Sequence, residues 1–348
     1  MIILAIETSC DDTGIALIEV DNKKKPKIKV LSNIISSQVE IHKKYGGVYP
    51  LLAKREHERN LPLVFEKAMR QAKNPKINVI AVTVGPGLEP CLWIGVNFAK
   101  KLVKKLKASM IPINHIEAHI YANFLKPKLD FKKIFPAISL IVSGGHTQII
   151  LVKAFGGYKI LGETRDDAAG ECFDKVARML GLDYPGGPAI EKKAKEFRRK
   201  TSKLEISLPR PMMNQKNYDF SFSGLKTAAL YHFQSQKPKV QKSQEYIKSM
   251  AHELQQAIID VLIYKTLKAA KEYNVKSIVL GGGVSANKEL RKQFKKNIKK
   301  ELLNVNCYLP AIKHSTDNAL MIALTAYYLL KNKDKRWKKA TVNANLRL

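Results

Sequence analysis

The sequence lacks any apolar run close to the roughly 20 residues that a bilayer-spanning helix needs, so we expect no membrane contact. No basic segment precedes the first apolar run, and acidic residues follow that run closely. This order predicts a buried strand rather than a secretory signal peptide. Cysteine is also scarce, because the four cysteines are scattered and form no CxxC pair. We therefore expect reduced thiols and a soluble cytoplasmic protein.

Acidic residues are in short supply relative to basic ones. The chain has 61 Lys+Arg against 30 Asp+Glu and a formal net charge of +31. A surplus of this size favours a polyanionic partner such as RNA, although a lysine-rich proteome would give the same balance. The basic clusters are spread along the chain, at residues 23–25, 100–107, 192–203 and 292–300. The charge is therefore compatible with RNA binding and does not prove it.

The usual nucleotide-binding motifs are missing, since there is neither a Walker A loop nor a GxGxxG fingerprint. Three glycine clusters are present instead, at residues 143–147, 183–189 and 281–283. The first fills a turn whose bare amides could cradle phosphates, and the third follows an apolar strand, where a nucleotide can approach the backbone. Each cluster alone is also an ordinary turn. As a set they favour nucleotide binding.

Short apolar runs rich in β-branched residues predict strands, and apolar residues at three- and four-residue spacing predict helices. The predicted strands are residues 2–6, 14–20, 79–84, 110–113, 137–142, 147–152 and 277–280. The predicted helices are residues 50–72, 91–106, 167–180, 244–273 and 317–330. This mixture indicates an α/β protein. We expect residues 198–215 to form an exposed excursion and the polar tail after residue 331 to be only partly ordered.

One pattern occurs twice along the chain. Residues 2–20, IILAIETSCDDTGIALIEV, read as an apolar strand, a polar turn and a second apolar strand, and residues 137–154, AISLIVSGGHTQIILVKA, repeat the design. Two such hairpins predict duplicated lobes that face one cleft. We expect the first lobe to be residues 1–133, with the C-terminal residues 318–348 packing back on it. The second lobe is then residues 134–317, which carry the glycine clusters.

Two histidines have the spacing of metal ligands. His115 and His119 lie four residues apart in a predicted helix, so both imidazoles can reach one ion, although such pairs also occur without a metal. The order is His-x-Glu-x-His, and at about 100° per residue Glu117 points about 200° away from His115. The glutamate base of zinc proteases is therefore missing. Asp317, which begins the last predicted helix, is the candidate third ligand, and it reads equally well as an N-cap.

Carboxylates crowd the turn of the first hairpin, where Glu7, Asp11 and Asp12 occur together. They could hold a cation or orient a reacting group, or simply make an exposed turn polar. In the second half of the chain, the negative charge of Asp167 can interact favourably with the dipole of the predicted helix that it begins. Asp174 lies inside that helix, so it is the better candidate for contact with a ligand.

Seven motifs resemble those of the tRNA N6-adenosine threonylcarbamoyltransferase family, which includes the bacterial transferase subunit and the archaeal and eukaryotic Kae-type proteins. They are ETSCDDTG, HIEAHIYAN, VSGGHTQ, DDAAGECFDKVARMLGLDYPGGP, FSFSGLKTA, LGGGVSANKELR and STDNALMIA, in this order. The resemblance extends from residue 2 to about residue 330, and residues 166–188 are of the bacterial type. It implies the α/β fold of the actin, sugar-kinase and Hsp70 ATPases, with two ribonuclease-H-like lobes around a central nucleotide cleft.

The resemblance also implies a reaction and its site. A threonylcarbamoyl group would move from threonylcarbamoyl-AMP to N6 of adenine 37, in tRNAs that read codons beginning with A, and AMP would leave. One divalent metal ion, Fe²⁺ or Zn²⁺, would be held by His115, His119 and Asp317. Asp11 and Asp12 match the family's paired acids and are the candidate catalytic residues, with Asp11 as the proton acceptor. The family usually has Asp-Glu, so the shorter Asp12 leaves a direct role for this residue open. The expected donor-binding residues are Ile141, Val142, Ser143, Gly144, Gly145, Asp174, Gly187, Glu191 and Asn287.

The implied partners are tRNA, a catalytically inactive paralogue (TsaB-like) and a small ATPase (TsaE-like), while a separate enzyme makes the donor. Three alternatives stay open. An ATPase or small-molecule kinase of the same fold would turn over nucleotide with magnesium and without RNA. A metallopeptidase is disfavoured by the missing base glutamate. A non-catalytic RNA-binding protein is disfavoured by the intact His115, His119 and Asp317.

Overall fold

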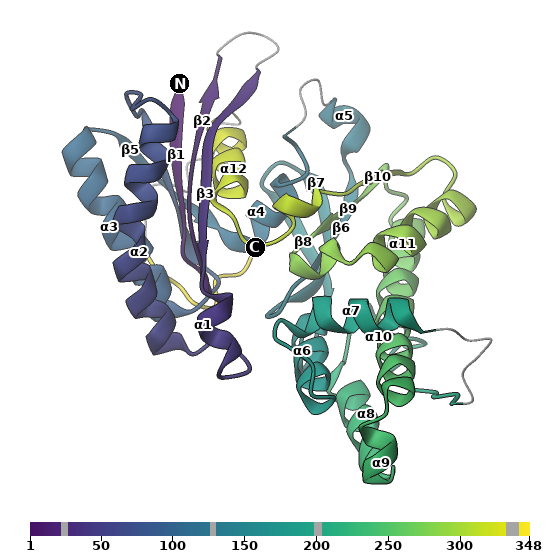
Figure 1. Ribbon diagram of the computed structural model, residues 1–348. Coiled ribbons are helices and arrows are strands. Elements are labelled where there is room, and N and C mark those ends of the chain that lie inside the picture. The colour runs from purple at the N-terminus through teal and green to yellow at the C-terminus, as the bar shows by residue number, and fades with distance from the viewer. Residues whose placement is uncertain (22–26, 126–129, 198–203, 332–340) are drawn as a thin grey trace. The chain divides into compact units, whose positions relative to one another are not determined.

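A computed structural model describes residues 1–21, 27–125, 130–197, 204–331 and 341–348 (Figure 1). The chain forms two compact units, of which one comprises Met1–Lys132, Ala154–Tyr158 and Pro310–Leu348 and the other Lys133–Lys153 and Lys159–Leu309. The C-terminal segment of the first unit thus begins before the predicted position 318, and Asp317 lies in this unit. The basic cluster at residues 23–25 and residues 198–203 of the predicted excursion lie outside the described residues.

The first unit is built on a five-stranded sheet with the order β3-β2-β1-β4-β5. β1 (Ile2–Glu7) pairs antiparallel with β2 (Asp12–Val20) and parallel with β4 (Val79–Gly85). β2 also pairs with β3 (Ile28–Ser37), and β4 pairs in parallel with β5 (Ser109–Asn114). The helices are α1 (Val39–Lys43), α2 (Pro50–Gln71), α3 (Glu89–Leu106), α4 (His115–Tyr121), η2 (Ile312–His314) and α12 (Ala319–Lys331). The short α5 (Phe131–Ile134) lies where the chain passes from one unit to the other.

The first sheet is covered on both faces, which explains the unbroken apolar run of β1. Leu4 and Ile6 pack with Leu61 of α2 and Val96 of α3 in one cluster. The helix α12 contacts β1 and β2, and in Figure 1 it lies on the opposite side of the sheet from α2 and α3. A strand with both faces buried needs apolar residues at every position. The run ends at Glu7, where β1 reaches the edge of the sheet.

The C-terminal segment 341–348 belongs to the folded structure of the first unit. The Asn343 N–H donates to the Val84 carbonyl at 2.9 Å, and Val342 and Leu346 pack against the core. The prediction of partial order for the tail stays untested as a whole, because residues 332–340 lie outside the described residues. The polar composition of residues 341–348 does not reveal that their backbone pairs with the end of β4 while two apolar side chains pack beside it.

The second unit repeats the topology of the first. Its sheet has the order β10-β9-β6-β7-β8, so its first strand is again flanked by its second and fourth. β6 (Ala137–Val142) pairs antiparallel with β7 (Thr147–Ala154) and parallel with β9 (Ser277–Gly281). The outer strands are β8 (Gly157–Glu163) and β10 (Asn306–Tyr308). The two predicted hairpins are β1–β2 and β6–β7, and each starts a ribonuclease-H-like sheet.

Helices cover the second sheet with one large apolar core. Alternate residues of β6, namely Ile138, Leu140 and Val142, pack with α6, α10 and α11. The helices of this unit are α6 (Ala169–Met179), α7 (Gly186–Glu196), α8 (Ser223–Gln234), α9 (Pro238–Gln241), α10 (Gln244–Glu272), η1 (Gly283–Ala286) and α11 (Lys288–Glu301). Among the described residues, no helix combines the length and the apolarity needed to cross a membrane.

Residues 204–215, part of the predicted exposed excursion, are fastened to α10. The Arg210 guanidinium forms ion pairs with Glu253 and Asp260 of that helix. Asp219 follows this segment, and its backbone carbonyl accepts a hydrogen bond at 2.6 Å from the ammonium of Lys265, a fully buried residue of α10. This described part is therefore only partly exposed, because Ile206 and Leu208 are buried in the core while most of the other residues are half-buried or exposed. The sequence shows its charge and its prolines, but not the acidic partners that α10 supplies from far along the chain.

A glycine at the end of β9 provides a test of the second unit. Gly282 has φ +85° and ψ 158°, a conformation almost confined to glycine, and a Cβ there would lie 2.3 Å from the Val142 carbonyl oxygen. We expect Gly282→Ala to lower the free energy of unfolding by about 2–3 kcal/mol, measured by urea denaturation. The control is Gly144→Ala, where a Cβ meets no atom within 4 Å, with a change below about 0.5 kcal/mol. Equal stability of both variants would contradict the close packing of β9 against β6.

Candidate functional site

The helix α4 places the two histidines on one face. The Asn114 side chain caps this helix, because its Oδ1 accepts from the Ile116 N–H at 2.8 Å and the Glu117 N–H at 3.2 Å. His115 is therefore the first helical residue, directly after β5, and His119 follows one turn later. The two rings are both buried, with centroids 4.7 Å apart. The predicted juxtaposition of the two imidazoles is present.

Glu117 points away from this face, as the helical spacing predicts. Its Oε1 accepts a hydrogen bond from the Tyr158 hydroxyl at 2.6 Å. Burial, together with the charge of Glu117, raises the pKa of Tyr158 well above its ordinary value. Glu117 thus has a buried partner of its own and is not the base that a zinc protease places beside its histidines.

Asp317 faces the histidines from the segment before α12. Its Oδ1 lies 3.5 Å from His115 Nε2 and 3.2 Å from His119 Nε2. The cap of α12 is the neighbouring Asn318, whose Oδ1 accepts from the Met321 N–H at 3.2 Å. The structure thereby separates the two interpretations that the sequence left open for Asp317. The capping role belongs to Asn318, and the Asp317 carboxylate lies between the two imidazoles.

The chemistry of these three residues fits a metal ion. Their potential ligand atoms all lie within 4.8 Å of one another. Neither ring nitrogen of the buried His119 has a hydrogen-bond partner of suitable geometry among the described residues, although Asp317 is near. Burial lowers the pKa of His119, which favours the neutral imidazole that metal binding requires. Two imidazoles and one carboxylate are ligands that zinc and ferrous iron accept.

A further carboxylate, Glu7 at the end of β1, lies on the far side of His115. Glu7 is fully buried, and its Oε2 lies 3.2 Å from His115 Nδ1. Burial opposes a charge on His115, but the carboxylates of Asp317 and Glu7 outweigh it and raise the pKa of His115 to about 9. The sequence reasoning noted Glu7 only as one of several crowded acids. A clearer signal was available, because Glu7 is a carboxylate that ends an otherwise apolar, buried strand.

Asp11 and Asp12 occupy the turn between β1 and β2. Burial and the charge of Asp317 raise the pKa of Asp11. Burial and the charge of Asp11 raise the pKa of Asp12 to about 7. The buried Oδ1 of Asp12 has no hydrogen-bond partner among the described residues. Both carboxylates are thus stronger bases than a solvated aspartate, which suits general base catalysis near neutral pH.

In the second unit, the predicted phosphate cradle is a tight turn between β6 and β7. The Ser143 N–H donates to the His146 carbonyl at 2.8 Å, and the Gly170 N–H at the start of α6 donates to the Ser143 carbonyl at 3.1 Å. A Cβ added at Gly144 or Gly145 would meet no atom within 4 Å. The backbone of the turn is therefore open to a ligand, next to the N-terminus of an 11-residue helix.

Asp174 and Gly187 lie where α6 meets α7. The Asp174 Oδ1 accepts from the Gly186 N–H at 2.7 Å, so the carboxylate ties the two helices together. Gly187 is the second residue of α7, and a Cβ there would meet nothing within 4 Å. The structure thus gives Asp174 a local structural bond and leaves Gly187 with open space beside it.

Glu191 and Asn287 connect α7, α11 and α10. The Glu191 Oε1 accepts from the Lys288 N–H at 2.7 Å. The Asn287 Oδ1 caps α11 by accepting from the Leu290 N–H at 2.9 Å, and its Nδ2 donates to Gln255 at 2.8 Å. These bonds hold the start of α11 against α7 and α10, near the glycine segment that follows β9. Both residues therefore have a structural task, whatever ligand they contact.

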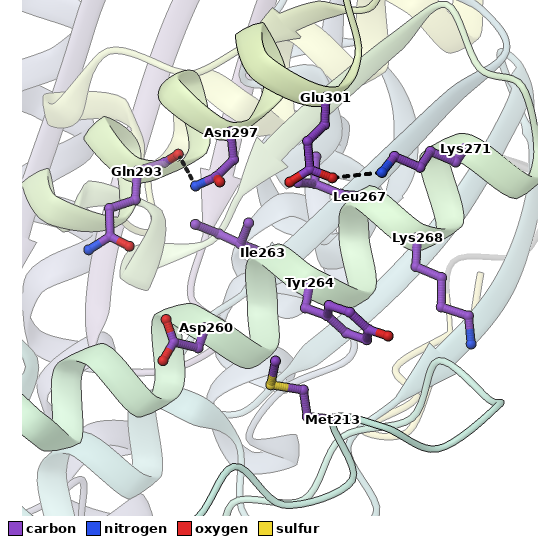
Figure 2. Close-up of a pocket in the computed structure, with 10 residues that line it drawn as sticks. All are labelled: Met213, Asp260, Ile263, Tyr264, Leu267, Lys268, Lys271, Gln293, Asn297 and Glu301. Carbon is purple, nitrogen blue, oxygen red and sulfur yellow. Dashed lines mark hydrogen bonds and ion pairs between the residues drawn. The ribbon is translucent and has the colours of Figure 1, made fainter. Parts of the chain in front are cut away.

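A pocket of about 380 Å³ also lies on the second unit, between α10 and α11 (Figure 2). An ion pair of 2.6 Å joins Lys271 and Glu301 at its wall. None of the residues predicted to bind the metal or the donor lines this pocket. The lining residues are Met213, Asp260, Ile263, Tyr264, Leu267, Lys268, Lys271, Gln293, Asn297 and Glu301.

Comparison with known proteins agrees with the motifs. Residues 29–324 match the family described as tRNA N6-adenosine threonylcarbamoyltransferase. A protein of this name from Thermosipho africanus is 47% identical over 338 residues, covering 95% of both chains. Another from Geobacillus kaustophilus is 44% identical over 329 residues, covering 94% of this chain and 91% of the relative. The likeness therefore extends over nearly the whole length of these relatives.

A solved structure supports the fold. The crystal structure of T. kodakarensis HypF superposes with a TM-score of 0.57 at 14% sequence identity, covering 95% of this chain and 48% of that one. At this identity the likeness shows the fold alone, which is the actin, sugar-kinase and Hsp70 type predicted from the motifs. The matched family and the identity of its relatives go further. The chain belongs to the tRNA N6-adenosine threonylcarbamoyltransferase family and is a transferase that acts on tRNA.

Proposed function

We propose that this protein transfers a threonylcarbamoyl group from threonylcarbamoyl-AMP to N6 of adenine 37, in cytosolic tRNAs that read codons beginning with A. AMP is the second product. The observation that carries the proposal is the convergence of His115, His119 and Asp317 within 4.8 Å, in a chain of this family. The carboxylates of Asp11 and Asp12, whose pKa values respond to the charge of Asp317, belong to the same unit.

His115, His119 and Asp317 would hold one divalent ion, Fe²⁺ or Zn²⁺. The bound ion would supply Lewis acidity for polarising or orienting the donor. The buried His119 supports this assignment, because neither of its ring nitrogens has a hydrogen bond of good geometry among the described residues, and its Nε2 lies 3.2 Å from the Asp317 carboxylate.

The donor would bind to the second unit, at the carboxyl ends of β6 and β9. The turn at Gly144 and Gly145, where an added Cβ would meet no atom, lies beside the N-terminus of α6 and would offer backbone N–H groups to the adenylate phosphate and to a developing oxyanion. Gly187 leaves room for close approach of the ligand to the start of α7. The residues that we propose to bind the donor are Ile141, Val142, Ser143, Gly144, Gly145, Asp174, Gly187, Glu191 and Asn287.

In the transfer, the exocyclic N6 attacks the carbamoyl carbon, and a C–N bond forms. The bond from that carbon to the phosphate oxygen breaks, and AMP leaves with the electron pair. The attacking nitrogen must lose a proton, and Asp11 is the acceptor that we assign. Burial and the neighbouring Asp317 raise the pKa of Asp11, which strengthens it as a base.

The partners that we propose are tRNA, a TsaB-like inactive paralogue and a TsaE-like ATPase. The net charge of +31 supports contact with tRNA phosphates, and the basic cluster at residues 292–300 lies on α11. The proposed domains are residues 1–133 with 318–348, and residues 134–317. Three segments differ in the structure: Ala154–Tyr158 and the segment from Pro310 onward, with Asp317, go with the first unit, and Lys133 goes with the second.

The transfer itself is the first test. Purified protein with its two partner proteins receives labelled threonylcarbamoyl-AMP and a tRNA that reads a codon beginning with A. We expect label to enter the tRNA, and incorporation to be lost in the His115→Ala/His119→Ala variant, because the metal ligands are gone. No incorporation by folded, metal-loaded protein would contradict the proposed reaction and favour the ATPase alternative, which magnesium-dependent nucleotide turnover without RNA would reveal.

Asp317 and Asn318 form a matched pair for testing the metal site. Asp317→Ala removes a proposed ligand without removing the helix cap, so we expect weaker zinc binding with little change in stability of the metal-free protein. Asn318→Ala removes the cap, so we expect about 1 kcal/mol lower stability and unchanged zinc affinity. Calorimetric zinc titration and urea denaturation measure the two quantities. The reverse pattern would assign Asp317 to the helix and not to the metal.

Asp11→Asn tests the proton acceptor. We expect the single-turnover transfer rate to fall about 10²- to 10⁴-fold, while the affinity for zinc stays unchanged, because the amide cannot accept the proton. Asp12→Asn is the matched variant. An unchanged rate for Asp11→Asn with a large loss for Asp12→Asn would move the role to Asp12, whose pKa is raised to about 7.

A further inference from the structure

We propose that Glu7 is a positioning residue for the metal centre, and that it also couples this centre to the turn that carries Asp11. Its carboxylate accepts a hydrogen bond from His115 Nδ1–H, so that His115 Nε2 is left with its lone pair for a metal ion. This inference rests on the proposed metal site.

The tautomer of His115 follows from the contacts on its two nitrogens. Nδ1 lies 3.2 Å from Glu7 Oε2, and Nε2 lies 3.5 Å from Asp317 Oδ1. A neutral imidazole has one N–H, and an ionised carboxylate can only accept. If Nδ1 donates to Glu7, Nε2 is the coordinating atom, and it is the one that faces Asp317 and the His119 ring. A carboxylate behind a metal-binding imidazole fixes the tautomer and raises the basicity of the ligand.

The Ser9 hydroxyl is a competing partner, since its Oγ also lies 3.2 Å from His115 Nδ1. A hydroxyl can donate or accept, so Ser9 alone would not select a tautomer. Glu7 carries the charge, and a charge-assisted hydrogen bond is the stronger one. Glu7 therefore decides the orientation of the ring.

The strand pairing fixes where the Glu7 carboxylate sits. Glu7 ends β1, and its Oε2 also accepts from the Thr83 hydroxyl of the adjacent β4 at 2.7 Å. Its Oε1 accepts from the Ser9 N–H at 2.6 Å. A fully buried carboxylate is strongly destabilising unless such donors surround it. With His115, these donors come from three segments, so that the carboxylate cannot move without disturbing all of them.

The bond to Ser9 extends the influence of Glu7 to the acidic turn. The Leu88 N–H donates to the Ser9 carbonyl at 2.8 Å, and a Cβ at Gly87 would lie 2.8 Å from the Ser9 Cβ. The chain at Ser9 is thus held between Glu7 and the segment after β4, two residues before Asp11. The Glu7 carboxylate therefore fixes the orientation of the His115 ring and also the position of Ser9, where the turn that carries the proposed base begins.

The test compares zinc affinity, measured by competition with a chromophoric chelator, in wild-type protein and Glu7→Gln. The amide keeps the shape of the side chain but loses the charge, so we expect zinc binding to weaken about 10- to 100-fold. The control, Thr83→Val, removes one hydrogen bond to Glu7 and keeps the charge, and we expect less than a tenfold change. Circular dichroism of the metal-free proteins establishes folding. Wild-type affinity in folded Glu7→Gln would overturn the inference.

A second measurement is independent of whether Glu7→Gln folds. Long-range ¹H–¹⁵N correlation spectra of zinc-loaded wild-type protein report which His115 nitrogen carries the proton, and we expect Nδ1–H with zinc on Nε2. A proton on Nε2 would overturn the inference, even if zinc binds. In that case the metal site itself would still be supported if wild-type protein binds zinc and the His115→Ala/His119→Ala variant does not. Wild-type protein that binds no zinc would overturn the metal site, and this inference with it.

Discussion

In each sheet, the central strand pairs in parallel with a strand that comes later in the chain, and this pairing determines where polar groups can gather into a site. β1 pairs with β4 in the first unit, and β6 pairs with β9 in the second, so each sheet has its carboxyl strand ends at one edge. Glu7 ends β1, Thr83 lies two residues before the end of β4, and His115 follows β5 directly. In the second unit, the glycine-rich segments follow β6 and β9. Polar side chains and bare backbone meet at these edges because the apolar strands end there.

The proposed metal site of the first unit is a chain of alternating acids and imidazoles. Glu7 contacts His115, and Asp317 lies close to both His115 and His119. Each carboxylate stabilises the charge of a neighbour that burial alone would suppress, which is why the pKa of His115 is raised although its ring is buried. The protonation states of these groups therefore depend on one another.

Several residues that the motifs assign to donor binding also hold helices together. Asp174 joins α6 to α7, and Asn287 caps α11 and contacts α10. Changes at these positions alter stability and ligand binding together, so a loss of activity alone does not reveal a role. Gly144 and Gly187 are different, because their Cβ positions meet no atom. Substitutions there probe ligand contact with the least disturbance of packing.

The sequence by itself determined the central strands, the helical face shared by His115 and His119, and the family, because burial and helical spacing leave local patterns and the motifs are contiguous. Only the tertiary structure decided that Asn318 caps α12 while Asp317 faces the histidines, since both residue types suit both tasks. It also showed that Glu7 lies beside His115, and it revealed the outer strands β3, β8 and β10, which are half-buried or exposed over much of their length. These features depend on partners far along the chain, and local composition does not encode which oxygen meets which nitrogen.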